Sequence, residues 1–192
     1  MNQTKTHDEP TRQRAVFWDR DGTLMHEVGY CSRITDVKTI PGIADTLRTL
    51  RELGLLNIII TNQSGIHRGY LSVEEYEAVN EELFRQLNFR PDAVYYCPDL
   101  PQTISRRRKP APGMIEEACK EFHIDPAKSW MIGDKESDIL CGRTAGCRTI
   151  LVHTGYGKNC PSSLADYTAT SAAEIAEIIL AETTRPNPVK GA

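Results

Sequence analysis

Short apolar runs rich in β-branched residues alternate along the chain with segments in which apolar residues recur every three or four positions. The short runs predict buried strands, and the recurring pattern predicts helices that pack against them. Strands are expected at residues 15–18, 55–60, 93–97, 130–132 and 149–152. Helices are expected at residues 43–53, from residue 72 onward, and at residues 113–122, 137–145 and 172–181. This alternation predicts an α/β fold: a single doubly wound, mostly parallel, Rossmann-like sheet with helices on both faces.

Residues that end or cap helices mark several of these boundaries. Gly54 ends the first helix, and Ser72 with Glu75 three positions later is a capping-box signature for the next one. The whole pattern fits one domain over residues 14–183. Disordered tails are expected over residues 1–13 and 184–192.

The composition is that of an ordinary globular protein and narrows the possible partners. Of the 192 residues, 40% are hydrophobic and 26% are charged, and the formal net charge is −3. Such a charge does not favour binding to nucleic acid or to an anionic membrane. No apolar run approaches the roughly 20 residues that span a bilayer, and the first residues lack the apolar core of a secretory signal. We therefore expect a cytoplasmic protein without nucleic-acid or membrane partners, and a monomer because no exposed apolar stripe is evident.

Four polar strings follow the predicted strands. They are residues 19–23 (DRDGT), 61–65 (TNQSG), 108–110 (RKP) and 133–138 (GDKESD). In a doubly wound sheet, ligands bind beyond the carboxyl ends of the strands. We therefore expect these strings to meet at one edge of the sheet and to form one site.

Carboxylates dominate this expected site. Asp19, Asp21 and Asp134 would repel one another at a sheet edge unless a cation neutralised them. Hard oxygen ligands of this kind suit Mg²⁺. Aspartates next to glycine and threonine can also simply form turns and cap helices. The placement of all four strings after strands favours a functional site over that alternative.

The four strings resemble the four signature motifs of the haloacid dehalogenase superfamily, specifically of its phosphatases, over residues 16 to about 157. The longer strings are similar to the branch that contains heptose-bisphosphate phosphatases and histidinol-phosphate phosphatases. The resemblance implies a Mg²⁺-dependent phosphomonoester hydrolase that acts through an aspartyl-phosphate.

The resemblance also implies roles for individual residues. Asp19 would be the nucleophile that attacks phosphorus. Asp21 would protonate the leaving oxygen and later deprotonate water. Lys109, the Thr61 hydroxyl and the backbone N–H of Asn62 would stabilise the phosphoryl oxygens.

The metal site follows from the same resemblance. Asp19, Asp134 and the backbone carbonyl of Asp21 would hold Mg²⁺. The backbone of Lys135 would lie near the metal, and Asp138 would support the ligands from behind.

The substrate is expected to enter an open site. Residues 22–60 and 62–108 are already occupied by sheet elements, so no separate cap domain fits in either interval. Among the substrate-binding residues, Arg108 could grip a second phosphate or a carboxylate through two hydrogen bonds. Arg106 and Arg107 are interpreted as a solvated basic turn. The full expected set is Glu27, Tyr30, Asn62, Gln63, Ser64, Arg68 and Arg108.

One departure from the family concerns zinc. Relatives in this branch often hold zinc with Cys-x-His and a later Cys-x-Cys, whereas this chain has Cys97-Pro98-Asp99 and residues 105–107 are Ser-Arg-Arg. One thiol is too few for a closed zinc site, which needs four nitrogen or sulfur ligands. We therefore predict no zinc, a packing role for Cys97, and free thiols for all six cysteines.

Heptose-bisphosphate phosphatase is the leading functional hypothesis, and histidinol-phosphate phosphatase is its nearest rival. The basic run at residues 106–109 leaves open a nucleic-acid 3′-phosphatase. A non-catalytic binding module is a further alternative, and the presence of Asp19, Asp21, Lys109 and Asp134 argues against it.

Overall fold

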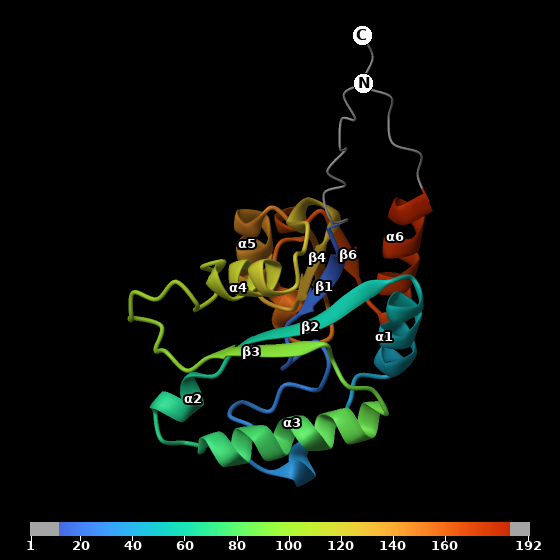
Figure 1. Ribbon diagram of the computed structural model, residues 1–192. Coiled ribbons are helices and arrows are strands. Elements are labelled where there is room, and N and C mark those ends of the chain that lie inside the picture. The colour runs from blue at the N-terminus through green and yellow to red at the C-terminus, as the bar shows by residue number, and fades with distance from the viewer. Residues whose placement is uncertain (1–11, 185–192) are drawn as a thin grey trace, which may run out of the picture.

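The computed structural model describes residues 12–184 (Figure 1). Within that range, six strands form one sheet in the order β3-β2-β1-β4-β5-β6, and every neighbouring pair is parallel. The predicted α/β fold with a parallel sheet is therefore confirmed. The strands are β1 (Arg14–Trp18), β2 (Leu55–Asn62), β3 (Ala93–Cys97), β4 (Trp130–Gly133), β5 (Arg148–Val152) and β6 (Tyr167–Ala169).

Helices connect these strands, and every helix expected from the sequence is present. The helices are α1 (Ile43–Glu52), α2 (Ser64–His67), α3 (Val73–Leu87), α4 (Gly113–Glu121), α5 (Glu136–Ala145) and α6 (Ala172–Thr184). Short 3₁₀ turns occur at η1 (Ile34–Asp36), η2 (Pro126–Lys128), η3 (Tyr156–Asn159) and η4 (Ser162–Leu164). The sequence pattern did not predict β6 and α2. Most of the two expected tails, residues 1–11 and 185–192, lies outside the described residues.

Local chemistry explains where the helices begin and end. At α3, the Ser72 hydroxyl accepts from the Glu75 backbone N–H at 3.1 Å, and the Glu75 carboxylate accepts from the Ser72 N–H at 2.7 Å. This is the predicted capping box, which satisfies donors that the first helical turn leaves free. At the end of α1, Gly54 has a φ of +74°, a conformation that glycine adopts without a steric penalty.

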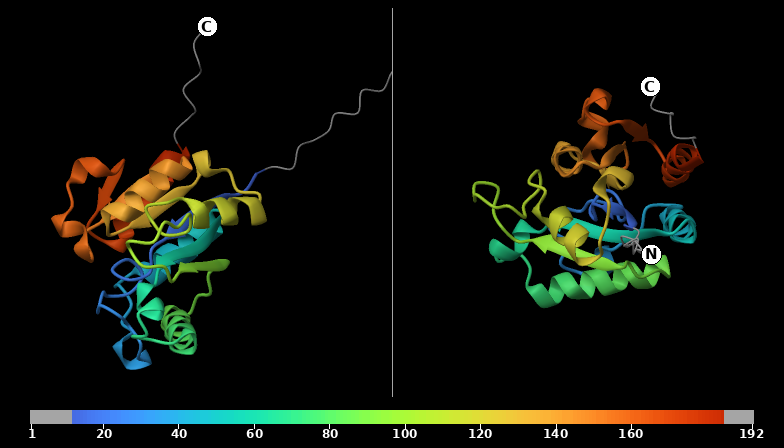
Figure 2. Two further views of the ribbon diagram at one scale, coloured as in Figure 1. Left: turned by 90° about the vertical axis from the view of Figure 1, so that its left-hand side faces the viewer. Right: turned by 45° about the horizontal axis from the view of Figure 1, so that its top comes forward.

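Alternation along β1 divides the core into two layers. Val16 and Trp18 face one cluster, which includes buried residues of α1, α3 and α6. Ala15 and Phe17 face the other, which includes buried residues of α4 and α5. Because successive side chains of a strand point to opposite faces, the central strand is buried on both sides. Figures 1 and 2 show α4 and α5 on one side of the strands and α1, α3 and α6 on the other.

The order of the strands positions the functional loops. The chain leaves β1 toward β2 on one side, while β4 lies on the other side, so the direction of winding reverses between β1 and β4. A crevice forms at such a reversal, at the carboxyl ends of the strands. Among the described residues, no cap domain interrupts the connections that follow β1 and β2. None of the described helices has the length and apolar content that a membrane span requires.

Candidate active site

A buried lysine links two carboxylates beyond the end of β1. The Nζ atom of Lys109 lies 2.6 Å from Asp19 Oδ1 and 2.7 Å from Asp138 Oδ1, and it also donates to the Ile60 carbonyl at 2.9 Å. Burial alone would lower the pKa of Lys109, but Asp138 and Asp19 raise it above its ordinary value. The ammonium therefore stays charged. The pairing explains why these three side chains can be buried together.

A reciprocal contact holds Lys109 at this position. The side-chain amide of Asn62, at the end of β2, donates to the Lys109 carbonyl at 3.0 Å and accepts from the Lys109 N–H at 3.1 Å. The loop that carries Lys109 is therefore fixed to the edge of the sheet. The motif resemblance implies a catalytic role for the backbone N–H of Asn62, whereas this role of its side chain is seen only in the fold.

Three carboxylates could hold a metal ion. Oxygen atoms of Asp19, Asp134 and Asp138 all lie within 4.8 Å of one another. Burial raises the pKa of Asp134 to about 7, and the charge of Asp19 adds to this effect. Burial likewise raises the pKa of Asp19 to about 6, although Lys109 opposes the rise. Asp134 Oδ1 is buried without a hydrogen-bond partner among the described residues. A buried, unsatisfied carboxylate oxygen beside other carboxylates fits a cation.

The loop after β5, which is not among the motifs expected to form the site, orients Asp134. The N–H of Tyr156 donates to Asp134 Oδ2 at 2.7 Å, which leaves Oδ1 free. A Cβ atom at Gly155 or at Gly22 would collide with the Asp134 carboxylate. The Thr154 hydroxyl donates to the Gly22 carbonyl at 2.6 Å and so ties this loop to the one after β1. The available signal in the sequence was the Thr-Gly-Tyr-Gly string at residues 154–157, which begins one residue beyond a predicted strand.

Asp21 lies at the wall of the site. Arg20 donates to both of its carboxylate oxygens, at 3.0 and 3.1 Å. The Gln63 amide donates to Asp21 Oδ2 at 2.8 Å and to the Thr61 hydroxyl at 2.9 Å. Gln63 therefore connects the carboxyl group expected to move protons with the hydroxyl expected to contact phosphate.

A cavity of about 810 Å³ opens above these groups. Asp21 and Lys109 line it together with residues from the segments that follow β1, β2, β3, β4 and β5. Of the expected substrate-binding residues, Arg68 does not line the cavity and is exposed. The other six do: Glu27, Tyr30, Asn62, Gln63, Ser64 and Arg108.

Ion pairing and aromatic contacts shape one side of the cavity. The Lys135 ammonium lies 3.0 Å from the Glu27 carboxylate and 4.9 Å from the centre of the Tyr156 ring. Tyr30 packs edge-on against Tyr70 at a centroid distance of 4.8 Å. Only the backbone of Lys135 was expected near the site, whereas its side chain also forms an ion pair with Glu27.

Hydrogen bonds around Ser105 close the loop on the opposite side. The Ser105 hydroxyl accepts from the backbone N–H groups of Arg107 and Arg108, each at 3.2 Å. The Arg108 guanidinium donates to the Asp99 carbonyl at 2.6 Å, and the Cys97 thiol donates to the Asp99 carboxylate at 3.3 Å. Cys97 is fully buried, in agreement with a packing role, and all six cysteines are free thiols. The absence of zinc stays a prediction.

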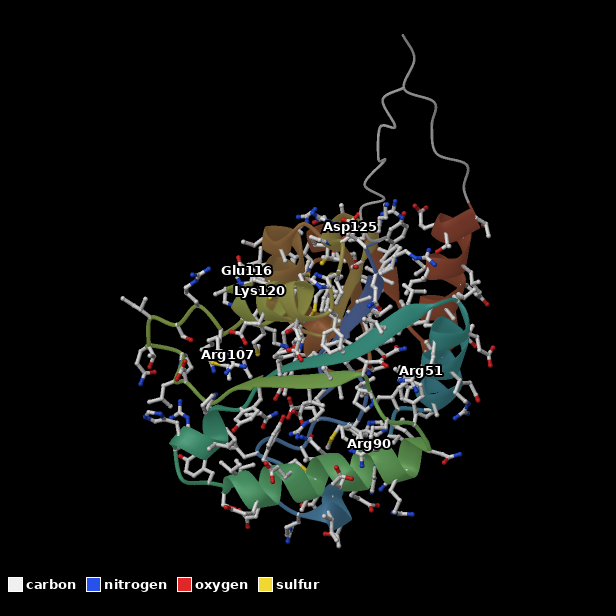
Figure 3. The ribbon with its side chains drawn as sticks, viewed as in Figure 1. Arg51, Arg90, Arg107, Glu116, Lys120 and Asp125 are labelled. Atoms are coloured by element: carbon white, nitrogen blue, oxygen red, sulfur yellow. The ribbon has the colours of Figure 1, made fainter. Side chains whose placement is uncertain are left out.

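Glutamates of α4 neutralise the basic run beside the site. Arg106 lies 2.9 Å from Glu116, and Arg107 lies 3.1 Å from Glu117. Figure 3 shows Arg107 and Glu116 on the same side of the molecule, beside α4. All four side chains are substantially exposed. This agrees with the interpretation of Arg106 and Arg107 as a solvated basic turn.

The parallel sheet, the aspartate pair after β1 and the buried lysine define a phosphatase of the haloacid dehalogenase type. The model of a family described as HAD-hydrolase-like matches residues 106–179. A D-glycero-beta-D-manno-heptose-1,7-bisphosphate 7-phosphatase of Haemophilus ducreyi is 41% identical over an alignment of 154 positions, and the alignment covers 74% of this chain and 85% of that protein. The Haemophilus influenzae protein of the same name is 36% identical over 86% of this chain and 96% of its own length. This chain belongs to the family of D-glycero-D-manno-heptose-1,7-bisphosphate 7-phosphatases.

Solved structures agree with this assignment. A D,D-heptose 1,7-bisphosphate phosphatase from B. bronchiseptica, complexed with magnesium and phosphate, superposes with a TM-score of 0.81 at 26% identity. The match covers 88% of this chain and 99% of that one. A HAD-like phosphatase from Mesorhizobium loti gives a TM-score of 0.78 at 28% identity, over 93% and 91% of the two chains. The resemblance stated from the motifs is therefore confirmed.

Proposed function

We propose that this phosphatase removes the 7-phosphate of D-glycero-D-manno-heptose 1,7-bisphosphate in a Mg²⁺-dependent reaction. The observation that carries the proposal is the buried Asp19–Lys109–Asp138 arrangement next to an open cavity that Lys109 helps to line. In it the carboxylate that we propose as the nucleophile lies next to the positive charge of Lys109, which supports a role in phosphoryl transfer. Two relatives that are 36% and 41% identical to this chain over the aligned positions are named for this activity.

In this mechanism Asp19 attacks the phosphorus atom of the ester. The oxygen–phosphorus bond to Asp19 forms as the bond to the sugar oxygen breaks, and Asp21 donates a proton to that oxygen. The ionised Asp21 then takes a proton from the water that releases phosphate from Asp19. Lys109 and the Thr61 hydroxyl stabilise the phosphoryl oxygens, together with the backbone N–H of Asn62.

Mg²⁺ fits the carboxylate group beneath the cavity. Asp19 and Asp134 would hold it, together with the backbone carbonyl of Asp21, and the unpaired Oδ1 of Asp134 supports this assignment. The ion would reduce the repulsion between the anionic nucleophile and the anionic phosphate. Asp138 supports the site through Lys109 and through its contact with the Lys135 N–H at 3.0 Å.

Residues at the mouth of the cavity suit a phosphorylated sugar. Glu27 and Tyr30 can accept or donate hydrogen bonds to hydroxyl groups, as can Ser64. Arg108 lines the cavity, and its guanidinium, which donates to the Asp99 carbonyl, could bind a second phosphate through its remaining donors. Because the glutamates of α4 pair with the neighbouring arginines, less free charge remains for nucleic acid. A cytoplasmic monomer without nucleic-acid or zinc partners is part of this proposal.

The test measures phosphate release with Mg²⁺ from heptose bisphosphate and from histidinol phosphate. We expect a higher kcat/KM for heptose bisphosphate. A clear preference for histidinol phosphate would remove the sugar assignment and leave the phosphatase in place.

The Asp19→Asn variant should release no phosphate from an aryl phosphate, because the amide cannot form the aspartyl-phosphate. The variant should keep the circular dichroism spectrum of the unaltered protein. Full activity of this variant would contradict the assignment of Asp19 as nucleophile.

A further inference from the structure

Arg20 is a buried arginine without an assigned role. Its side chain is 1% exposed, although it lies between Asp19 and Asp21 in the sequence. Its guanidinium forms a fork with Asp21: Nε donates to Oδ2 at 3.0 Å, and Nη2 donates to Oδ1 at 3.1 Å. A two-point contact of this kind fixes the plane of the carboxyl group as well as its position.

Helix α3 holds this guanidinium from the far side. Nη1 of Arg20 donates to Asn80 Oδ1 at 2.8 Å, and the guanidinium carbon lies 5.1 Å from the centre of the Tyr76 ring. Asn80 is four residues after Tyr76, so both side chains lie on the same face of α3. Neither residue lines the cavity. An element outside the active site therefore fixes a side chain that contacts its proton-transfer group.

Filling this part of the core does not require an arginine at position 20. A buried guanidinium is tolerated only when its donors are satisfied, and an apolar residue would fill the same space without that cost. Here the donors are directed to Asp21 and to an acceptor on α3 that is itself buried. The Gln63 amide adds a third contact to Asp21, at Oδ2. Rotation of the Asp21 carboxyl group would break all three contacts.

The contacts also distinguish the two oxygens of Asp21. Oδ2 accepts from both Arg20 and Gln63, whereas Oδ1 accepts, within the described part of the chain, from Arg20 alone and at the longer distance. Oδ1 therefore has more free capacity for a proton that is shared with the substrate. Oδ2 can remain bound while Oδ1 donates to the leaving oxygen.

We propose that Arg20, anchored on α3 by Asn80, is a positioning residue that holds the Asp21 carboxyl group in the orientation for proton transfer to the leaving oxygen. The inference rests on the proposed function, in which Asp21 is the general acid and base. The proton leaves Asp21 Oδ1 and joins the ester oxygen as the bond from that oxygen to phosphorus breaks and the bond from Asp19 to phosphorus forms. Arg20 itself exchanges no proton.

The test compares two esters with different needs for protonation. The leaving group of glycerol phosphate is an alcohol that departs poorly without a proton, whereas para-nitrophenyl phosphate releases a stable anion. The value of kcat/KM depends on the steps up to departure of the leaving group. Hydrolysis of the aspartyl-phosphate follows these steps and is the same reaction for both esters. In Asn80→Ala, which keeps Arg20 but removes its anchor, kcat/KM should fall about tenfold for glycerol phosphate relative to para-nitrophenyl phosphate. This expected loss is smaller than the rate increase of roughly 10²–10⁴-fold that general acid catalysis provides.

Two further variants make the result decisive. Arg20→Lys keeps the charge but cannot form the fork, so it should lower the same ratio at least as much. Glu77→Ala changes an exposed residue of α3 and should leave the ratio unchanged.

Equal losses for both esters in Asn80→Ala, or no loss for either, would overturn the inference. The role of Arg20 is tested with the two generic esters. The assignment of the sugar substrate is tested separately, by comparing heptose bisphosphate with histidinol phosphate. If the unaltered protein released phosphate from neither ester, both the inference and the general-acid role of Asp21 would fail.

Discussion

At the scale of single residues, the site depends on how a few buried charges are paired. Lys109 pairs with Asp19 and Asp138, and Arg20 pairs with Asp21, whereas among residues 12–184 one buried oxygen of Asp134 has no hydrogen-bond partner. A buried charge that loses its partner destabilises a protein by several kcal/mol, so each pair constrains the substitutions that the site tolerates. The unpaired oxygen of Asp134 marks the place where the protein alone does not complete the site.

The close contact between Gly155 and the Asp134 carboxylate leads to a prediction for Mg²⁺ affinity. In Gly155→Ala, the new methyl group would collide with the Asp134 carboxylate and displace it. Loss of groups that orient a ligand typically lowers metal affinity about 10–100-fold, and we expect a decrease in this range. Calorimetric titration with MgCl₂ measures it directly.

Gly146→Ala is the matched control. Gly146 has a φ of +85° and open space around its Cα, so alanine there strains the backbone without approaching a carboxylate. It should lower the free energy of unfolding by about 1 kcal/mol and leave Mg²⁺ affinity unchanged. Unaltered Mg²⁺ affinity in Gly155→Ala would show that Gly155 does not restrict Asp134.

The sequence could place some site residues and not others. Asp19 and Asp134 were predictable because each directly follows a strand, and all such positions meet at one sheet edge. The contact of Arg20 with Asn80 joins residues 60 positions apart and depends on which face of α3 is buried. No local spacing encodes such a pairing. The Glu27 contact of Lys135 escaped prediction for the same reason, since it crosses from one loop to another.

At the scale of elements, the longer helices and strands could be predicted from the sequence pattern, and the shortest ones could not. The five longer strands and the five longer helices span enough residues for a period to be visible. β6 has three residues and α2 has four, which is too short for either period to show. Both depend on their neighbours: β6 pairs with β5, and α2 follows the end of β2.

The loop between β3 and α4 gives a prediction at this scale. In Ser105→Ala, the N–H groups of Arg107 and Arg108 lose their acceptor, and the thiol of Cys97 loses a neighbour at 3.7 Å. The loop should become more mobile, and Arg108 should be less well placed for substrate. We expect KM for heptose bisphosphate to rise several-fold while kcat changes little, because Asp19 and Lys109 lie beneath the cavity.

Hydrogen exchange provides the structural measurement for this loop. The peptide that covers residues 98–108 should exchange faster in Ser105→Ala than in the unaltered protein. Gln102→Ala, an exposed change in the same loop, should alter neither exchange nor KM. Faster exchange without a rise in KM would show that loop order does not control substrate binding.

At the scale of the whole molecule, the parallel sheet gathers acidic groups from distant parts of the chain at one buried edge. Burial raises the pKa of Asp19 to about 6 and of Asp134 to about 7, from an ordinary value of 3.8. Between pH 4 and 7 the folded protein therefore retains protons that the unfolded chain releases. Folding stability contributed by these groups is highest below about pH 4, falls as the pH rises to about 7, and is constant above it.

Bound Mg²⁺ should reverse this loss, since metal ions bind ionised carboxylates and stabilise only the folded state that forms the site. We predict that MgCl₂ raises the Tm more at pH 8 than at pH 5. Asp134→Asn removes one of the two titrating groups. It should flatten the fall in Tm between pH 5 and 7 in the absence of metal and abolish most of the Mg²⁺ effect. Thermal unfolding followed by circular dichroism, with and without MgCl₂, provides both measurements. An equal rise in Tm at the two pH values would show that proton release from Asp19 and Asp134 is not linked to metal binding, and the cation would then have to bind elsewhere.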